Sequence, residues 1–143
     1  MSNQIQNPNV PSTLPPPLKL RRIKKFRRTS EKEYDLDERT AKFGEDIIKF
    51  LKLLPNNNLN YPIINQLIRS ATSIGANYME ADGAESKKDF RHKIALCKKE
   101  AKESMHWLRM VKVANSSAVD ECRIFWQEAH ELALIFSAIL KKK

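Results

Sequence analysis

Glycine is scarce in this chain, which has only three glycines among its 143 residues. They stand at positions 44, 75 and 83, well apart from one another. A fold rich in β-strands needs turn after turn, and a loop that holds phosphate through backbone amides needs several glycines close together. The scarcity therefore argues against a sheet-rich fold and against a glycine-rich phosphate loop, and it favours an all-α protein.

Cysteine is also rare, and long apolar runs are missing. Cys97 and Cys122 lie far apart, without the short spacing of zinc ligands. No segment approaches the roughly 18 apolar residues of a membrane span. The first residues lack the basic start and apolar stretch of a secretion signal. These absences predict a reduced, cytoplasmic protein with no disulfide and no contact with a membrane.

Negative charge is missing from the first 30 residues, which hold seven Lys or Arg and five of the seven prolines. Such a segment buries little apolar surface, so we expect a flexible, disordered Pro-rich basic arm over residues 1–33 and a folded domain over 34–143. The formal net charge of +9 favours polyanionic partners. A solvated arm that aids solubility is the alternative. The arm residues predicted to contact phosphate are Arg21, Arg22, Lys24, Lys25, Arg27 and Arg28.

Apolar residues recur at three- and four-residue steps in four segments of the chain. This spacing is typical of amphipathic helices, and it predicts helices over residues 37–54, 62–81 and 86–115, and a fourth from residue 117 into the C-terminal lysines. Ser86 and Ser117, each followed by an aspartate three residues later, are expected to cap the last two helices. Four helices joined by short loops fold most simply as an antiparallel up-and-down four-helix bundle.

Small residues crowd the stretch "SATSIGANYMEADGAESKK", which begins at Ser70. We interpret it as the end of the second helix, a turn, and the start of the third. Gly75 inside a helix costs about 1 kcal/mol relative to alanine, which indicates that a neighbouring backbone or ring needs the space. Gly83 is expected to end the helix in the left-handed conformation.

Candidate catalytic and metal-binding residues do not converge. Glu103 and His106 have the Glu-x-x-His spacing of diiron bundles, but the sequence has no second such pair, and a projection at 100° per residue turns both away from the core. Cys97 lies on the apolar stripe, which indicates a small buried hydrophobe. His92 and His130 have no orienting acid. The sequence therefore predicts a protein that is not an enzyme and has no metal or cofactor.

The same projection gathers the positive charges of the third helix into one basic stripe beside the core edge. We predict that this stripe contacts nucleic-acid phosphates; a solvated outer face is the alternative. No aromatic residue interleaves with its lysines, so base readout is not expected. The stripe consists of Lys88, Arg91, Lys98, Lys99, Lys102 and Arg109.

An adjoining sector of the third helix carries Leu96 and Trp107 together with two glutamates. A large indole outside the main core stripe is unusual in an isolated bundle. Leu96, Trp107 and Trp126 on the fourth helix are therefore predicted contacts between subunits. Positions at the edge of the core are the alternative for both tryptophans.

Two stretches resemble a known family. "QLIRSATSIGANYMEADGAESKKDF" and "KKEAKESMHWLRM" are similar to the four-helix-bundle family that includes proteins encoded by intervening sequences of bacterial 23S rRNA genes and accessory proteins of diversity-generating retroelements. The resemblance covers about residues 34–140 and implies a ring-shaped homopentamer of up-and-down bundles without enzymatic activity. For the retroelement branch it also implies binding to nucleic acid and to a reverse transcriptase. The branch stays open, because this chain has "SIGANYMEADG" where the commoner form reads "SIPANIAEG".

Together, these features predict a non-catalytic, homo-oligomeric accessory protein that binds nucleic acid through phosphate contacts. The alternative is a protein-interaction scaffold that recruits a protein partner without binding nucleic acid, with its positive charge serving solubility or an acidic partner.

Overall fold

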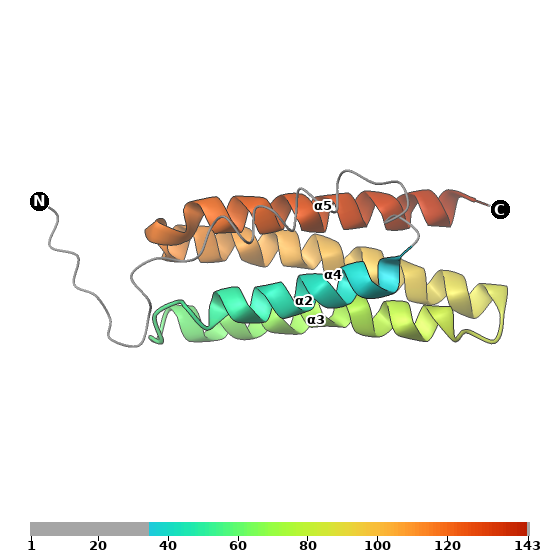
Figure 1. Ribbon diagram of the computed structural model, residues 1–143, viewed down its shortest axis with the longest axis horizontal. Coiled ribbons are helices and arrows are strands. Elements are labelled where there is room, and N and C mark those ends of the chain that lie inside the picture. The colour runs from blue at the N-terminus through green and yellow to red at the C-terminus, as the bar shows by residue number, and fades with distance from the viewer. Residues whose placement is uncertain (1–34, 143) are drawn as a thin grey trace, which may run out of the picture.

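Four long helices build the protein over residues 35–142, the part that this computed structural model describes. Each helix is antiparallel to the next along one long axis, as Figure 1 shows. The predicted all-α, antiparallel up-and-down four-helix bundle is confirmed, whereas the predicted arm and its boundary lie outside the described residues. None of the described helices has an apolar stretch long enough to cross a bilayer. The helices are α2 (Leu36–Leu51), α3 (Asn60–Asp82), α4 (Lys87–Ala114) and α5 (Val119–Lys141).

Side-chain caps set two of the helix starts. Asp35 begins α2 by accepting the backbone amide of Glu38 at 3.3 Å. Ser86 begins α4 by accepting the amide of Asp89 at 3.0 Å, which confirms the predicted cap. α2 ends at Leu51 rather than at residue 54. The prediction was too long because the next leucine, at position 54, is buried in the following turn and so continues the apolar spacing without continuing the helix.

Two predicted helix boundaries are wrong in detail, one at the start of α5 and one at the end of α3. Ser117 does not cap the last helix: Ser116–Ala118 form a 3-10 turn, and α5 begins after Ala118 without a hydrogen bond from a capping side chain. Gly83 does not adopt the left-handed conformation, since its φ is −95° and no described glycine has a positive φ. The amide of Gly83 still donates to the carbonyl of Met79, so α3 ends on an ordinary helical hydrogen bond.

Aromatic rings and a buried thiol fill the centre of the bundle. Phe125 of α5 lies 5.3 Å from Phe50 and meets Phe43 edge-on at 6.4 Å, measured between ring centroids, which joins α5 to α2. Cys97 is fully buried, as predicted, and its thiol donates to the carbonyl of Ile74 at 3.5 Å. Burial raises the pKa of the Cys97 thiol to about 12, so the thiol is protonated at neutral pH and is a poor nucleophile.

Small residues let α2 and α3 approach each other closely. A methyl group added to Gly75 would lie 3.4 Å from the backbone of Thr40 and Ala41. A methyl group added to Gly44 would lie 3.5 Å from the Cα atom of Thr72. The prediction that a neighbouring backbone occupies the space beside Gly75 is confirmed, and side chains larger than alanine would push the two helices apart.

A buried pair of asparagines closes one end of the bundle. The side-chain amides of Asn60 and Asn115 exchange two hydrogen bonds, of 2.8 and 2.9 Å, and Asn60 also donates to the carbonyl of Pro55 at 2.8 Å. The two residues are 1% and 6% exposed. This contact was not predicted. It ties the start of α3 to the end of α4, because each amide satisfies the other away from water.

A buried ion pair joins the first described helix to the last, and it was not predicted either. The Nε and Nη2 atoms of Arg39 donate to the two carboxylate oxygens of Glu128 at 3.0 and 2.7 Å. The side chains are 4% and 3% exposed, and Glu131 lies 3.6 Å from the same guanidinium. Burial raises the pKa of the Glu128 carboxyl, while the hydrogen bonds and charge of Arg39 oppose that rise.

Candidate nucleic-acid interface

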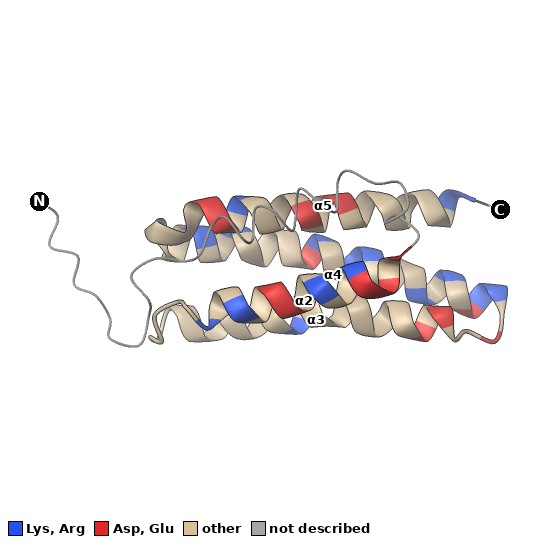
Figure 2. Cartoon of the chain, viewed as in Figure 1, with Lys and Arg blue, Asp and Glu red and all other residues tan. Residues whose placement is uncertain are grey.

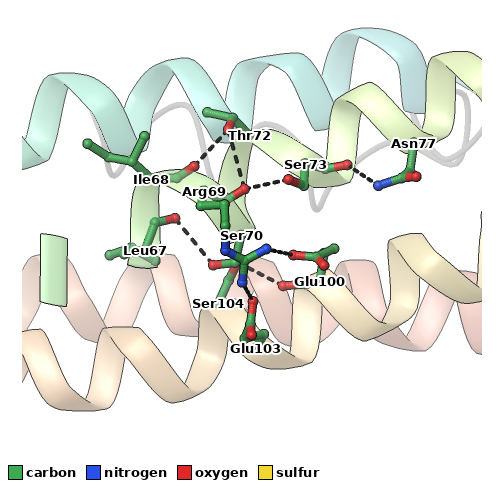
Figure 3. A network of polar contacts seen from close by, with 10 residues as sticks. All are labelled: Leu67, Ile68, Arg69, Ser70, Thr72, Ser73, Asn77, Glu100, Glu103 and Ser104. Atoms are coloured by element: carbon green, nitrogen blue, oxygen red, sulfur yellow. Dashed lines mark hydrogen bonds and ion pairs between the residues drawn. The ribbon is translucent and has the colours of Figure 1, made fainter. Parts of the chain in front are cut away.

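On the face of α4 that borders α3, two acidic side chains are paired with an arginine of α3. Arg69 of α3 contacts both Glu103 and Glu100 of α4, with 3.3 Å between the Nη1 atom and the Oε2 atom of Glu100 (Figure 3). The hydroxyls of Ser70 and Ser104 lie 3.0 Å apart beside these contacts. Burial raises the pKa of the Glu100 carboxyl, and Arg69 opposes the rise. The two glutamates of the predicted outer sector are thus used in a contact between helices of the same chain.

The opposite flank of α4 carries cations without acidic partners. Arg91 bonds to α5 and Arg109 lines a pocket with α5, so the helix register places the basic stripe along this flank. Lys93, outside the stripe, pairs with Glu80 of α3 at 3.3 Å. By contrast, the following stripe residues have no carboxylate within ion-pair distance among residues 35–142: Lys88, Lys98, Lys99, Lys102 and Arg109.

Arg91 differs from the other residues of the predicted stripe. Its guanidinium donates to the carbonyls of Leu140, at 2.7 Å, and of Lys142, at 3.0 Å. A cation at the C-terminal end of a helix satisfies carbonyls that have no intrahelical partner and complements the helix dipole. The structure therefore gives Arg91 a role in fixing the end of α5, and we do not include it in the candidate interface.

A pocket of about 330 Å³ opens between α4 and α5, close to the turn that joins them. Its charged lining is entirely positive. The apolar part of the lining includes Cys122, whose thiol pKa burial raises to about 12, so this group stays neutral. In Figure 2, a positively charged segment of α4 and one of α5 lie near this end of the bundle, with an acidic segment of α5 beside them. The lining residues are Leu108, Arg109 and Lys112 from α4 and Cys122, Arg123 and Trp126 from α5.

Sequence reasoning missed half of the polar and aromatic lining of this pocket. It assigned Arg109 to the basic stripe and Trp126 to a subunit contact, and it assigned no role to Lys112 or Arg123. The signal was present within each helix, since the two residues from α4 and the two from α5 are each three positions apart and share a face. What joins the two pairs is the register between α4 and α5, which the sequence does not show.

The three predicted subunit contacts differ in how they are packed. Trp107 and Trp126 are half-buried and lie against the hydrophobic core, as expected for edge-of-core positions. Trp107 also buries its indole nitrogen without a hydrogen-bond partner in the described part of the chain. Leu96 is half-buried but is not among the side chains that pack against the core. Contact with another copy of the chain stays a prediction for all three.

No candidate metal site emerges from the described residues, in which no group of three His, Cys, Asp or Glu side chains could hold an ion. Glu103 contacts Arg69, and exposed His106 lies edge-on to the neighbouring indole, with ring centroids 4.9 Å apart. The two members of the Glu-x-x-His pair therefore have separate partners. The cations predicted to bind phosphate from the arm, residues 21–28, lie outside the described residues.

Two comparisons with known proteins find similar proteins. Residues 32–138 match the family described as 23S rRNA-intervening sequence protein. One similar crystal structure is that of a protein of unknown function from the S23 ribosomal protein family of Bacteroides thetaiotaomicron VPI-5482. It is 28% identical to this chain, with a TM-score of 0.68, and the match covers 74% of this chain and 98% of the other. No curated protein matches the chain.

Proposed function

The chain belongs to the family of 23S rRNA-intervening sequence proteins, and from that premise we propose that it is a non-catalytic accessory protein that binds nucleic acid through phosphate contacts and assembles with copies of itself. The observation that supports nucleic-acid binding best is the division of charge on α4. Glu100 and Glu103 of α4 contact Arg69 of α3. The cations on the flank toward α5 have no acidic partner among the described residues. An unpaired row of cations is the feature that attracts a phosphate backbone.

The arm strengthens this proposal, because it holds most of the excess positive charge. The whole chain carries a formal charge of +9, and residues 1–30 contain seven cations and no acid, which leaves only +2 for the rest. A bundle that is nearly neutral overall needs segregated charge to bind a polyanion. The stripe on α4 supplies that segregation, and the arm adds charge beyond it.

Replacing Lys98, Lys99 and Lys102 by glutamine tests the stripe. We expect affinity for duplex DNA and for structured RNA to fall by about 10- to 100-fold at low salt, because each lost phosphate contact also forfeits counterion release. Fluorescence anisotropy with a labelled duplex and a labelled RNA hairpin measures the change. Folding should be unaffected, since Lys99 and Lys102 are exposed and Lys98 is half-buried without an ion pair in the described chain.

A matched variant controls for the loss of net charge. Replacing Lys42, Lys49 and Lys52 of α2 and its C-terminal turn by glutamine removes the same charge from another face. The proposal expects this control to lose much less affinity than the stripe variant. Equal losses would show that only net charge matters, and an unchanged affinity in both variants would favour a scaffold that recruits a protein partner.

Self-assembly is the second part of the proposal, and Leu96 offers its cleanest test. The resemblance to a ring-forming family leads us to expect a pentamer, and Leu96 exposes apolar surface that the core does not use. Leu96→Glu should shift the assembly toward monomers in light scattering while circular dichroism keeps its helical signal. Val113→Glu, which changes a side chain that is 80% exposed on the same helix, is the control. A monomeric wild-type chain at tens of micromolar would contradict the proposal.

A further inference from the structure

The pocket between α4 and α5 combines features that phosphate binding alone does not require. Three cations and an indole ring share the lining of one pocket, and no carboxylate is part of that lining. We propose that this pocket binds one unpaired nucleotide of a single-stranded or looped nucleic acid, with its phosphate held by Arg109, Lys112 and Arg123 and its base against Trp126. This inference rests on the proposed function and refines it by naming the preferred form of nucleic acid.

The charge of the pocket favours a phosphate as the polar part of the ligand. Arg109, Lys112 and Arg123 have no ion pair among residues 35–142, so their donors are available to an incoming anion. Two of the three are arginines, whose planar guanidinium groups match phosphate oxygens in pairs. Three cations around one opening hold a charged group more strongly than a single surface lysine does, because their attractions act on the same group, even though solvent screens the exposed Arg109 and Arg123.

The indole favours a flat, unpaired base as the remaining part of the ligand. Trp126 is half-buried, and one side of its ring is covered by His130, with centroids 5.2 Å apart and planes 20° from parallel. This stacking holds the indole in place, and the ring borders the pocket. Base–aromatic stacking tolerates any base and strengthens binding by about 5- to 160-fold per base. The cations of the same pocket would then bind the phosphate of that nucleotide, while the indole binds its base.

The pocket favours single strands over duplexes, because only an unpaired base can reach its indole. Its volume of about 330 Å³ is at the small end of the range of ligand sites, which begins near roughly 300 Å³. Bases inside a duplex are stacked and paired, so they are not available to an indole outside the helix. The observation that no aromatic residue interleaves with the stripe lysines concerned α4, whereas the ring in this pocket comes from α5.

The test compares full-length wild type with Trp126→Leu, which keeps an apolar side chain against the core. Anisotropy titrations use a labelled thymidine single strand and a labelled duplex of the same length, at one salt concentration. We expect Trp126→Leu to weaken single-strand binding by about 5- to 160-fold and duplex binding by less than about twofold. Tyr61→Leu, which removes an aromatic side chain that is 64% exposed on α3, should change neither affinity.

A fluorescence measurement gives a second readout that does not depend on affinity. In a Trp107→Phe background, Trp126 is the remaining tryptophan, so its emission reports on the pocket. A base stacked on the indole quenches that emission, and the quenching should saturate with the single strand but not with the duplex. Arg109→Gln with Arg123→Gln should weaken the quenching, because the phosphate end of the nucleotide loses two cations.

Each outcome decides between the two proposals. Unchanged single-strand affinity in a folded Trp126→Leu variant, with no quenching, would overturn the pocket and leave phosphate binding by the stripe standing. Equal losses for single strand and duplex would reduce Trp126 to a structural role. No binding of either nucleic acid by wild type would overturn both proposals. If a glutamate-rich peptide quenched Trp126 and the single strand did not, the pocket would belong to an acidic protein partner.

Discussion

Glu128→Ala is expected to lower the free energy of unfolding by about 3 kcal/mol, the low end of the range for removing one partner of a buried ion pair. The variant leaves the guanidinium of Arg39 in a site where the arginine is only 4% exposed. That charge was desolvated on folding and was compensated by the two hydrogen bonds to Glu128, at 2.7 and 3.0 Å. Glu131, 3.6 Å away, retains part of the compensation, which is why the low end of the range applies.

Two further variants show whether the loss comes from an uncompensated charge. Replacing both partners, as Arg39→Met with Glu128→Leu, should restore most of the stability, since apolar pairs of similar volume often equal buried ion pairs. Glu80→Ala breaks the more exposed pair with Lys93, whose side chains are 58% and 25% exposed, and should cost no more than about 1 kcal/mol. Urea unfolding followed by circular dichroism measures all three. Similar small losses in Glu128→Ala and Glu80→Ala would contradict the account.

Deleting residues 18–28 is expected to reduce affinity for duplex DNA by about 100-fold or more at low salt and to reduce the magnitude of the salt slope by about 4 to 6. This segment contains all seven cations of the first 30 residues. Each cation that contacts a phosphate releases condensed counterions, so its removal acts on both the affinity and its dependence on salt. The helical signal should be unchanged, because the four described helices lie within residues 36–141.

The arm also supplies its own matched control. Residues 2–17 contain five prolines and no charged side chain, so their deletion shortens the arm without changing its charge. We expect this deletion to leave affinity and salt slope near their wild-type values. If both deletions had the same effect, arm length rather than phosphate contact would explain the result.

The elements that the sequence predicts well are those set by one helix at a time. The apolar spacing and the Ser86 cap place α4 almost at its observed limits, and the projection correctly separates Lys102 from the core. The failures occur at helix ends. At Ser117 the chain makes a 3-10 turn in place of a capped helix start. At Gly83, α3 ends with a φ of −95° in place of the predicted left-handed conformation.

The contacts between helices could not be predicted from the sequence, because they depend on how the helices pack together. Arg39 and Glu128 are 89 positions apart, and nothing local to either residue indicates the other. The pocket is similar: Arg109 and Trp126 were each singled out, but only the register of α4 against α5 puts them in one lining. A helical projection gives the direction of a side chain around its own axis and says nothing of what it meets.

The measurement that tests the central claim most directly is the affinity of the intact chain for duplex DNA across a series of salt concentrations. If the stripe and the arm neutralise phosphates, the logarithm of the affinity should fall linearly with the logarithm of the salt concentration, with a slope of magnitude at least about 6. A chain that shows no binding at about 50 mM salt, or an affinity that stays constant up to about 200 mM, would contradict the account.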